Sequence, residues 1–92
     1  MTIVPLGLVQ MTQGVNDLVA EDILFAKFVS DSLSRHAKGD WGEVSEADKQ
    51  ENENSLNKQL KLLSTYKYGD RKILIITETE WSSTTILLQG EY

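Results

Sequence analysis

The chain has 92 residues, of which 40% are hydrophobic and 25% are charged, and its formal net charge is −5. This balance predicts one small α+β domain over residues 1–92 and excludes a disordered or low-complexity chain. The chain contains no cysteine, which excludes disulfides, cysteine-ligated zinc and thiol catalysis. Because binding to a nucleic-acid backbone requires a basic surface and this chain is acidic, we expect no direct nucleic-acid binding.

The negative charge is concentrated in residues 40–54. This segment holds six acids and a single base, Lys49, so it carries the entire net charge, and the rest of the chain is neutral. The six acids are Asp40, Glu43, Glu46, Asp48, Glu51 and Glu53.

Targeting signals are absent from the N-terminal residues, which lack the basic and apolar regions of a signal peptide. No window approaches the roughly 18 apolar residues that span a bilayer. We therefore expect a cytoplasmic protein that does not enter the membrane.

The first part of the chain predicts a strand followed by a long helix. Residues 6–11 are apolar and rich in β-forming side chains, which favours a short strand. Asn16 or Asp17 can cap a helix, and the apolar spacing extends this helix over residues 18–37. Lys38 and Gly39 are typical of a helix C-terminus. The apolar stripe of the helix comprises Leu18, Phe25, Phe28, Val29 and Leu33.

The second part of the chain predicts another helix and a β-hairpin. Ser45 begins a helix over residues 46–66. Residues 72–77 are typical of a buried central strand, and residues 84–88 of a second strand. The order β-α-α-β-β predicts a three-stranded antiparallel sheet with two helices packed on one face. The apolar face of the second helix comprises Leu56, Leu60, Leu63 and Tyr66.

His36, the single histidine, has two interpretations. It precedes Asp40 by four residues, so the two, together with Glu43, could form the centre of a metal-dependent or acid–base enzyme. Helical phase instead places His36 on the stripe of Phe25 and Val29, which indicates a packed or capping side chain. Because nucleophile and phosphate-loop motifs are missing, we expect no catalytic residue, no metal and no cofactor.

The acidic segment has three interpretations. Glu46, Asp48, Glu51 and Glu53 complement the positive N-terminus of the second helix, or they form a docking surface for a protein partner with a basic surface. The third interpretation is a site for a hard cation, but the residue spacing of a calcium loop is missing.

The two tryptophans differ in their predicted surroundings. Trp41 lies between the predicted helices and is expected to cover one edge of the core, with its indole N–H at the surface. Trp81 is expected at the tip of the hairpin, where it either contacts a partner or folds back on the sheet. The candidate partner-binding residues are therefore Asp40, Trp41, Glu43, Glu46, Asp48, Glu51, Glu53 and Trp81.

Three stretches together carry a resemblance: residues 11–22, residues 39–42 (Gly-Asp-Trp-Gly) with residues 48–53, and residues 75–78 leading to residues 84–87 and the ending Glu91-Tyr92. They resemble a family of small proteins of plasmids and integrative elements, some labelled plasmid-related protein or type I restriction subunit M. The second label does not fit, because a DNA methyltransferase needs a double-proline motif and the only proline is Pro5. Trp81 departs from the family pattern. The resemblance implies a mobile-element setting and supplies no catalytic residues.

These observations predict a small, acidic, non-enzymatic partner-binding protein of a mobile genetic element. In that setting the expected task is to modulate or inhibit a host defence or nucleic-acid-handling protein. A self-associating structural protein is another alternative, because Ile86, Leu87 and Leu88 lie on a predicted edge strand that could pair in a homodimer.

Overall fold

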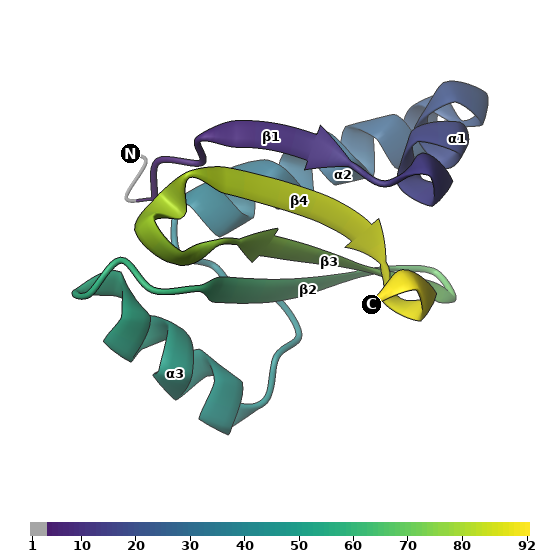
Figure 1. Cartoon of the computed structure of the whole chain (residues 1–92). Coiled ribbons are helices and arrows are strands. Elements are labelled where there is room, and N and C mark those ends of the chain that lie inside the picture. The colour runs from purple at the N-terminus through teal and green to yellow at the C-terminus, as the bar shows by residue number, and fades with distance from the viewer. Residues whose placement is uncertain (1–3) are drawn as a thin grey trace.

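Residues 4–92, which the computed structural model describes, form an α+β fold with three α-helices and a four-stranded mixed sheet. The strand order across the sheet is β1-β4-β3-β2 (Figure 1). Short 3-10 turns precede and follow the last strand. In chain order the elements are β1 (Leu8–Met11), α1 (Gln13–Glu21), α2 (Ile23–Ala37), α3 (Glu46–Leu56), β2 (Leu62–Tyr68), β3 (Arg71–Thr77), the turn Thr79–Trp81, β4 (Ser83–Leu88) and the turn Gln89–Glu91.

The sheet differs from the predicted one in strand number and direction. The predicted hairpin of β3 and β4 is confirmed, with Ile75 opposite Ile86. A further strand, β2, pairs antiparallel with β3, and β1 pairs parallel with β4. The α+β class is therefore confirmed, whereas the three-stranded antiparallel sheet in the order β-α-α-β-β is wrong.

The long N-terminal helix that the apolar spacing predicts is divided into two helices at Asp22. The Asp22 carboxylate accepts hydrogen bonds from the backbone N–H groups of Leu24 and Phe25, and therefore caps α2. Thr12 caps α1 by accepting from the N–H of Val15. The predicted caps at Asn16 and Asp17 are wrong because these residues already lie inside α1.

The predicted second helix ends at Leu56, about halfway along its expected length. Ser45 caps it as predicted, by accepting from the N–H of Asp48. Residues 62–66, expected in its second half, instead belong to β2, which extends to Tyr68. In β2, Tyr66 points into the core beneath the helices and Leu63 points to the opposite face, so these two residues do not share a stripe.

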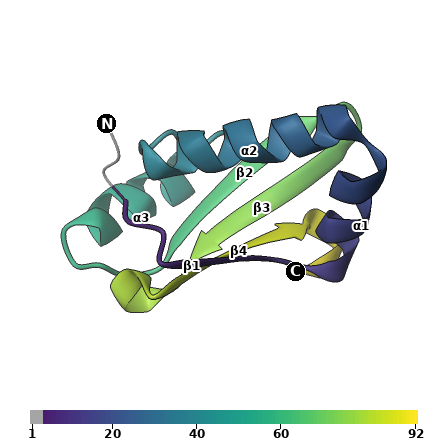
Figure 2. The ribbon, with the colours of Figure 1, turned by 90° about the horizontal axis from the view of Figure 1, so that it is seen from above.

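Helices α1 and α2 cover one face of the sheet, and α3 lies beside the β2 edge (Figure 2). The prediction that the helices over residues 18–37 and 46–66 both pack on this face is therefore wrong for the second helix, because α1 and α2 together replace the first one and α3 lies at the edge. Apolar side chains of both helices pack against alternate residues of the sheet. The buried members of this main core are Val15, Phe25, Val29, Tyr66, Ile73, Ile75 and Ile86.

The outer edge of β2 is closed by hydrogen bonds from two neighbouring segments. The Asn52 side chain on α3 donates to the carbonyl of Leu63 and accepts from its N–H, at 2.7 and 3.1 Å. At Thr65 the backbone N–H donates to the carbonyl of Trp41, and the carbonyl accepts from the N–H of Glu43. Because these outward-facing groups of β2 already have partners, they cannot template another strand.

Candidate protein-binding groove

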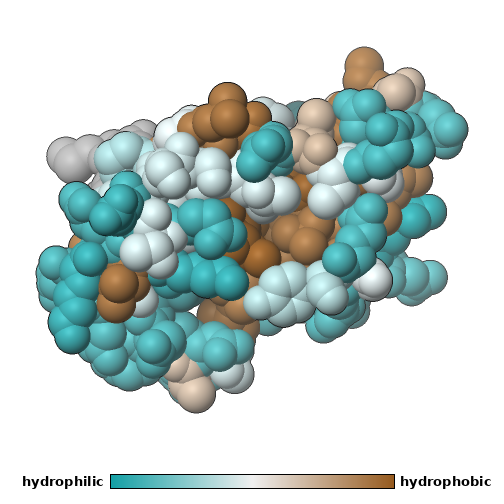
Figure 3. All heavy atoms as spheres, viewed as in Figure 1, coloured by the Kyte–Doolittle hydropathy of each residue, from teal (hydrophilic) through white to brown (hydrophobic). Residues whose placement is uncertain are grey.

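The second face of the sheet carries its own apolar cluster. It consists of Leu63 on β2, Leu74 and Ile76 on β3, and Leu87 on β4, which point away from α1 and α2. Figure 3 looks onto this face and shows apolar surface in its middle, surrounded by hydrophilic side chains. Among residues 4–92 no helix lies across this cluster. We call this side the open face of the sheet.

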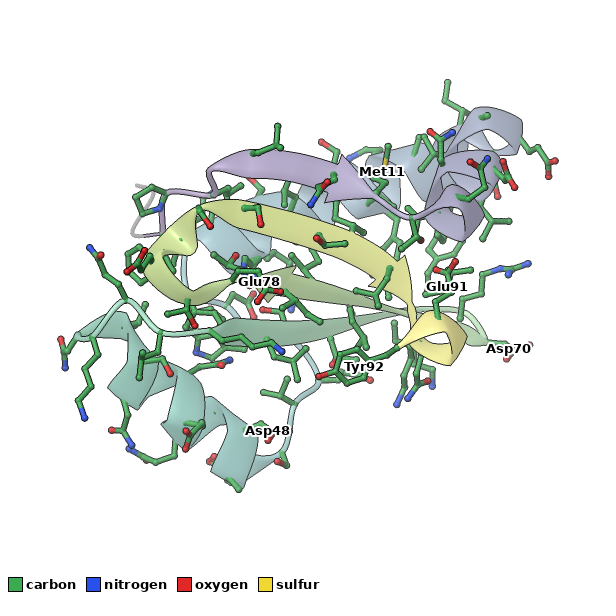
Figure 4. All side chains as sticks on the ribbon, in the orientation of Figure 1. Met11, Asp48, Asp70, Glu78, Glu91 and Tyr92 are labelled. Atoms are coloured by element: carbon green, nitrogen blue, oxygen red, sulfur yellow. The ribbon has the colours of Figure 1, made fainter. Side chains whose placement is uncertain are left out.

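A groove of about 260 Å³ borders the open face where α3 meets it. Asp48, on α3, and the C-terminal Tyr92 are far apart in the sequence but lie on the same side of the molecule, where both line the groove (Figure 4). Apolar, acidic and basic side chains therefore meet in one recess, which suits a peptide or protein segment of mixed character. The groove is lined by Asp48, Glu51, Asn52, Lys61, Leu63 and Tyr92.

The C-terminal turn that carries Tyr92 is held in place by Glu91. Its carboxylate accepts a 2.6 Å hydrogen bond from the Thr12 hydroxyl and a 2.8 Å bond from the N–H of Leu88. The bond from Thr12, and then the bond from Leu88, lower the pKa of Glu91. This anchor ties the chain end to the start of α1, so that Tyr92 stays beside the groove while remaining largely exposed.

The acids of α3 lie on two flanks of the helix. Asp48 and Glu51, three residues apart, line the groove. Glu46 and Glu53, seven residues apart, lie on the flank turned away from it, because a helix advances about 100° per residue. All four carboxylates are exposed. Only half of the acidic charge on the helix therefore faces the groove.

Asp40 lies outside the groove and forms an ion pair with Arg35. The Asp40 carboxylate accepts from Arg35 Nε at 2.7 Å and from Nη2 at 3.2 Å, and this pairing lowers the pKa of Asp40. The Arg35 guanidinium also lies 4.8 Å from the centre of the Tyr66 ring. Glu43, close by, contributes its backbone N–H to the closed β2 edge and exposes its side chain. This group fastens the loop after α2 to the sheet.

Both tryptophans belong to a third apolar cluster, with Val4 and Leu62. Trp41 is 3% exposed, and its indole N–H has no hydrogen-bond partner in the described part of the chain. The prediction of an indole N–H at the surface is therefore wrong, although the ring does cover the core. Trp81 is half-buried against this cluster, and its indole N–H donates to the carbonyl of Leu60 at 3.1 Å. The alternative in which Trp81 folds back on the sheet is the one observed.

We expect Trp81→Phe to lower the free energy of unfolding by about 1 kcal/mol, because the aromatic ring is kept but one hydrogen bond is lost. Trp81→Ala should cost more, since it also removes the ring from the cluster with Trp41. Urea denaturation of both variants measures the two costs. Equal costs would contradict the packing contribution of the ring, and a Trp81→Phe variant as stable as the native chain would contradict the contribution of the hydrogen bond.

His36 is fully buried, which confirms the packed interpretation. Its Nδ1 lies 2.5 Å from the Ser64 hydroxyl and its Nε2 lies 2.8 Å from the Thr77 hydroxyl. Burial lowers the pKa of His36 to about 4. Both ring nitrogens are therefore engaged within the core, while Asp40 is engaged by Arg35, so the structure does not bring together the pair on which the enzyme alternative depends.

Residues 4–92 contain neither a cluster of metal-ligating side chains nor a membrane-spanning helix. No group of three or more His, Cys, Asp or Glu side chains in this range is placed to hold a metal ion. No helix in the same range has the length and apolar character needed to cross a bilayer.

Comparisons with protein-family models, with curated proteins and with solved structures each gave no match for this chain. The resemblance to proteins of plasmids and integrative elements therefore stays a prediction.

Four of the groove residues, Asn52, Lys61, Leu63 and Tyr92, were not predicted from the sequence. Leu63 could have been assigned to a strand from the alternation of residues 62–66, because this pattern fits a strand as well as a helix. Nothing in the sequence indicates that Tyr92 lies beside α3, because the two are brought together only by the folded sheet.

Proposed function

We propose that this chain is a small, non-enzymatic protein that binds a protein partner through the groove between α3 and the open face of the sheet. The observation that carries this proposal is a groove in which the apolar side chains of Leu63 and Tyr92 lie beside the acids Asp48 and Glu51. A partner segment with apolar side chains and basic residues has the matching chemistry. In a mobile-element setting, such a partner would be a host defence or nucleic-acid-handling protein.

The electrostatic part of the proposal depends on where the charge lies. The acids of α3 are exposed, so they act mainly on the rate of association, and salt weakens their effect. Leu74, Ile76 and Leu87 are each at most 7% exposed, so the apolar contribution after contact comes from the half-buried Leu63 and from the exposed Tyr92 ring, which lose their remaining exposure to water. Trp41 is already buried, so it supports the fold and does not anchor the partner.

A pair of matched double variants tests this proposal. Asp48→Asn with Glu51→Gln removes two charges from the groove flank, and Glu46→Gln with Glu53→Gln removes two charges from the opposite flank. Baits with either change, or with none, are used in pull-downs from the native host at low and high salt. We expect the partner recovered by the unmodified bait to be lost on the groove-flank bait and kept on the other, with recovery falling as salt rises.

The control is that both double variants carry the same change in net charge on the same helix. Their free energies of unfolding should agree with each other within about 0.5 kcal/mol, because all four side chains are exposed and each variant loses one acid, Glu46 or Asp48, from the first turn of α3. If both variants lose the partner equally, binding depends on net charge and not on the groove. If neither loses it, the acidic flank has no part in recognition.

A further inference from the structure

The two edges of the sheet differ in whether neighbouring segments cover them. The β2 edge is closed by the Asn52 side chain and by the backbone of residues 41–43. The β1 edge has no such cover among residues 4–92, and all four residues of β1 are exposed. Figure 2 looks down on this edge and shows β1 without an element in front of it. The predicted edge strand, residues 84–88, is in fact internal, because β4 lies between β1 and β3.

The register of β1 determines which backbone groups are free. The N–H groups of Leu8 and Thr12 donate to carbonyls of Ser82 and Ile86 beside or within β4. Because successive residues of a strand direct their backbone groups to opposite sides, the N–H and C=O groups of Val9 and Met11 point away from β4. These are the groups that another strand can pair with.

The β1 edge also lacks the features that normally prevent pairing. Natural edge strands are commonly protected by lysine, proline or a bulge. Residues 1–16 contain no charged side chain, Pro5 precedes the strand, and β1 pairs with β4 in an unbroken register. Leu8, Val9 and Met11 are 68%, 41% and 40% exposed. The edge is therefore apolar, neutral and available.

We infer that β1 pairs with β1 of a second copy of this chain, antiparallel across a two-fold axis, to form one continuous sheet. Val9 lies opposite Met11 of the second copy, Gln10 lies opposite Gln10, and each Val9–Met11 pair exchanges both backbone hydrogen bonds. The inference is independent of the groove, which lies at the other edge.

The charge distribution favours a second copy in this arrangement. The whole net charge of −5 lies in residues 40–54, on the β2 side of the sheet, and β1 and its neighbour β4 carry no charged residue. Two copies joined at β1 therefore keep their acidic segments at opposite ends of the shared sheet, where screening weakens the repulsion. Pairing in any arrangement that brings the α3 helices together would cost more. The shared edge is four residues long, so the dimer is weak and reversible.

The test measures the mass of the full chain by analytical ultracentrifugation over a wide concentration range. We expect a mass that rises from one chain toward two. Val9→Pro removes an outward N–H that β4 does not use, so it should leave the fold intact and raise the dissociation constant about tenfold or more. The mass of one chain at every concentration would overturn the inference.

Charge substitutions test the register independently of proline. Val9→Lys and Met11→Glu should each weaken the dimer, because each places an uncompensated charge at the paired edge. The chain with both substitutions sets a cation opposite an anion at each of the two Val9–Met11 positions, and should dimerise more tightly than either single variant. Circular dichroism verifies that each variant is folded. A dimer that none of these changes weakens, or a double variant weaker than both singles, would overturn the pairing through β1.

Discussion

We expect the free energy of unfolding to fall by about 3 kcal/mol between neutral pH and pH 4 because of His36 alone. The pKa of His36 is about 4 in the folded protein and 6.5 in the unfolded chain. Between these values the unfolded chain binds a proton that the folded chain does not, so acid favours unfolding. The contribution is fully present above pH 6.5 and is lost as the pH falls toward 4. Urea denaturation at a series of pH values measures it.

The hydrogen-bond network explains why the imidazole is held neutral. The Thr84 hydroxyl donates to the carbonyl of Leu6 at 2.7 Å, so it must accept from Thr77. The Thr77 hydroxyl has then used its hydrogen and accepts from His36 Nε2–H. His36 Nδ1 is left as an acceptor for the Ser64 hydroxyl. Every member of this buried chain is satisfied by a neutral imidazole, and a second ring proton adds a charge without a counter-ion.

His36→Gln is the control for this prediction. Glutamine keeps a donor and an acceptor but does not titrate, and we expect a loss of about 2 kcal/mol at neutral pH from imperfect hydrogen bonding and packing. The carboxylates still titrate in the variant, so its stability still depends on pH. The difference between the two proteins should shrink as the pH falls and reverse its sign before pH 4, because the native chain loses about 3 kcal/mol that the variant does not lose. A constant difference from neutral pH to pH 4 would show that His36 is not responsible.

The sequence pattern predicts the local elements better than their pairing. β3 and β4 were predicted nearly to the residue, because a continuous apolar run and a β-rich run leave few alternatives. β2 was not, since Leu56, Leu60 and Leu63 have helical spacing while Leu62, Ser64 and Tyr66 alternate as in a strand. Pairing with β3 decides between them, and it is a tertiary effect. The parallel pairing of β1 with β4 is non-local for the same reason.

The acidic segment was predictable as a charge pattern but not as a surface. Its residues and their helix follow from the sequence, and helical spacing even separates Asp48 and Glu51 from Glu46 and Glu53. Which pair faces a groove depends on how α3 docks, and that is set by Asn52. Asn52 is one of several uncharged polar residues in an acidic helix, and the sequence gives no sign that it reaches the backbone of a strand residue 11 positions further along the chain.

Asn52→Ala should lower the free energy of unfolding by about 2–4 kcal/mol, the second large effect we expect. The side chain is 3% exposed and is the polar link that joins α3 to the β2 edge. Its removal leaves the N–H and C=O of Leu63 unpaired at a partly buried edge, and the gain in helix propensity from alanine offsets only a fraction of this cost. Asn54→Ala, on the exposed face of the same helix, should change stability by less than about 0.5 kcal/mol. Urea denaturation of both variants gives the comparison.

Asn52→Asp distinguishes the two hydrogen bonds. The carboxylate still accepts from the Leu63 N–H but cannot donate to the Leu63 carbonyl. One carboxylate oxygen therefore faces the carbonyl oxygen at the 2.7 Å distance of the native bond. The neutral acid can donate, so folding raises the pKa of the introduced carboxyl group, and the variant should recover stability relative to the native chain as the pH falls through that pKa. A deficit that is unchanged by acid would mean that the bond to the carbonyl does not hold α3 at the edge. In that case the position of the groove acids would depend on the packing of Ser55 and Leu56 instead.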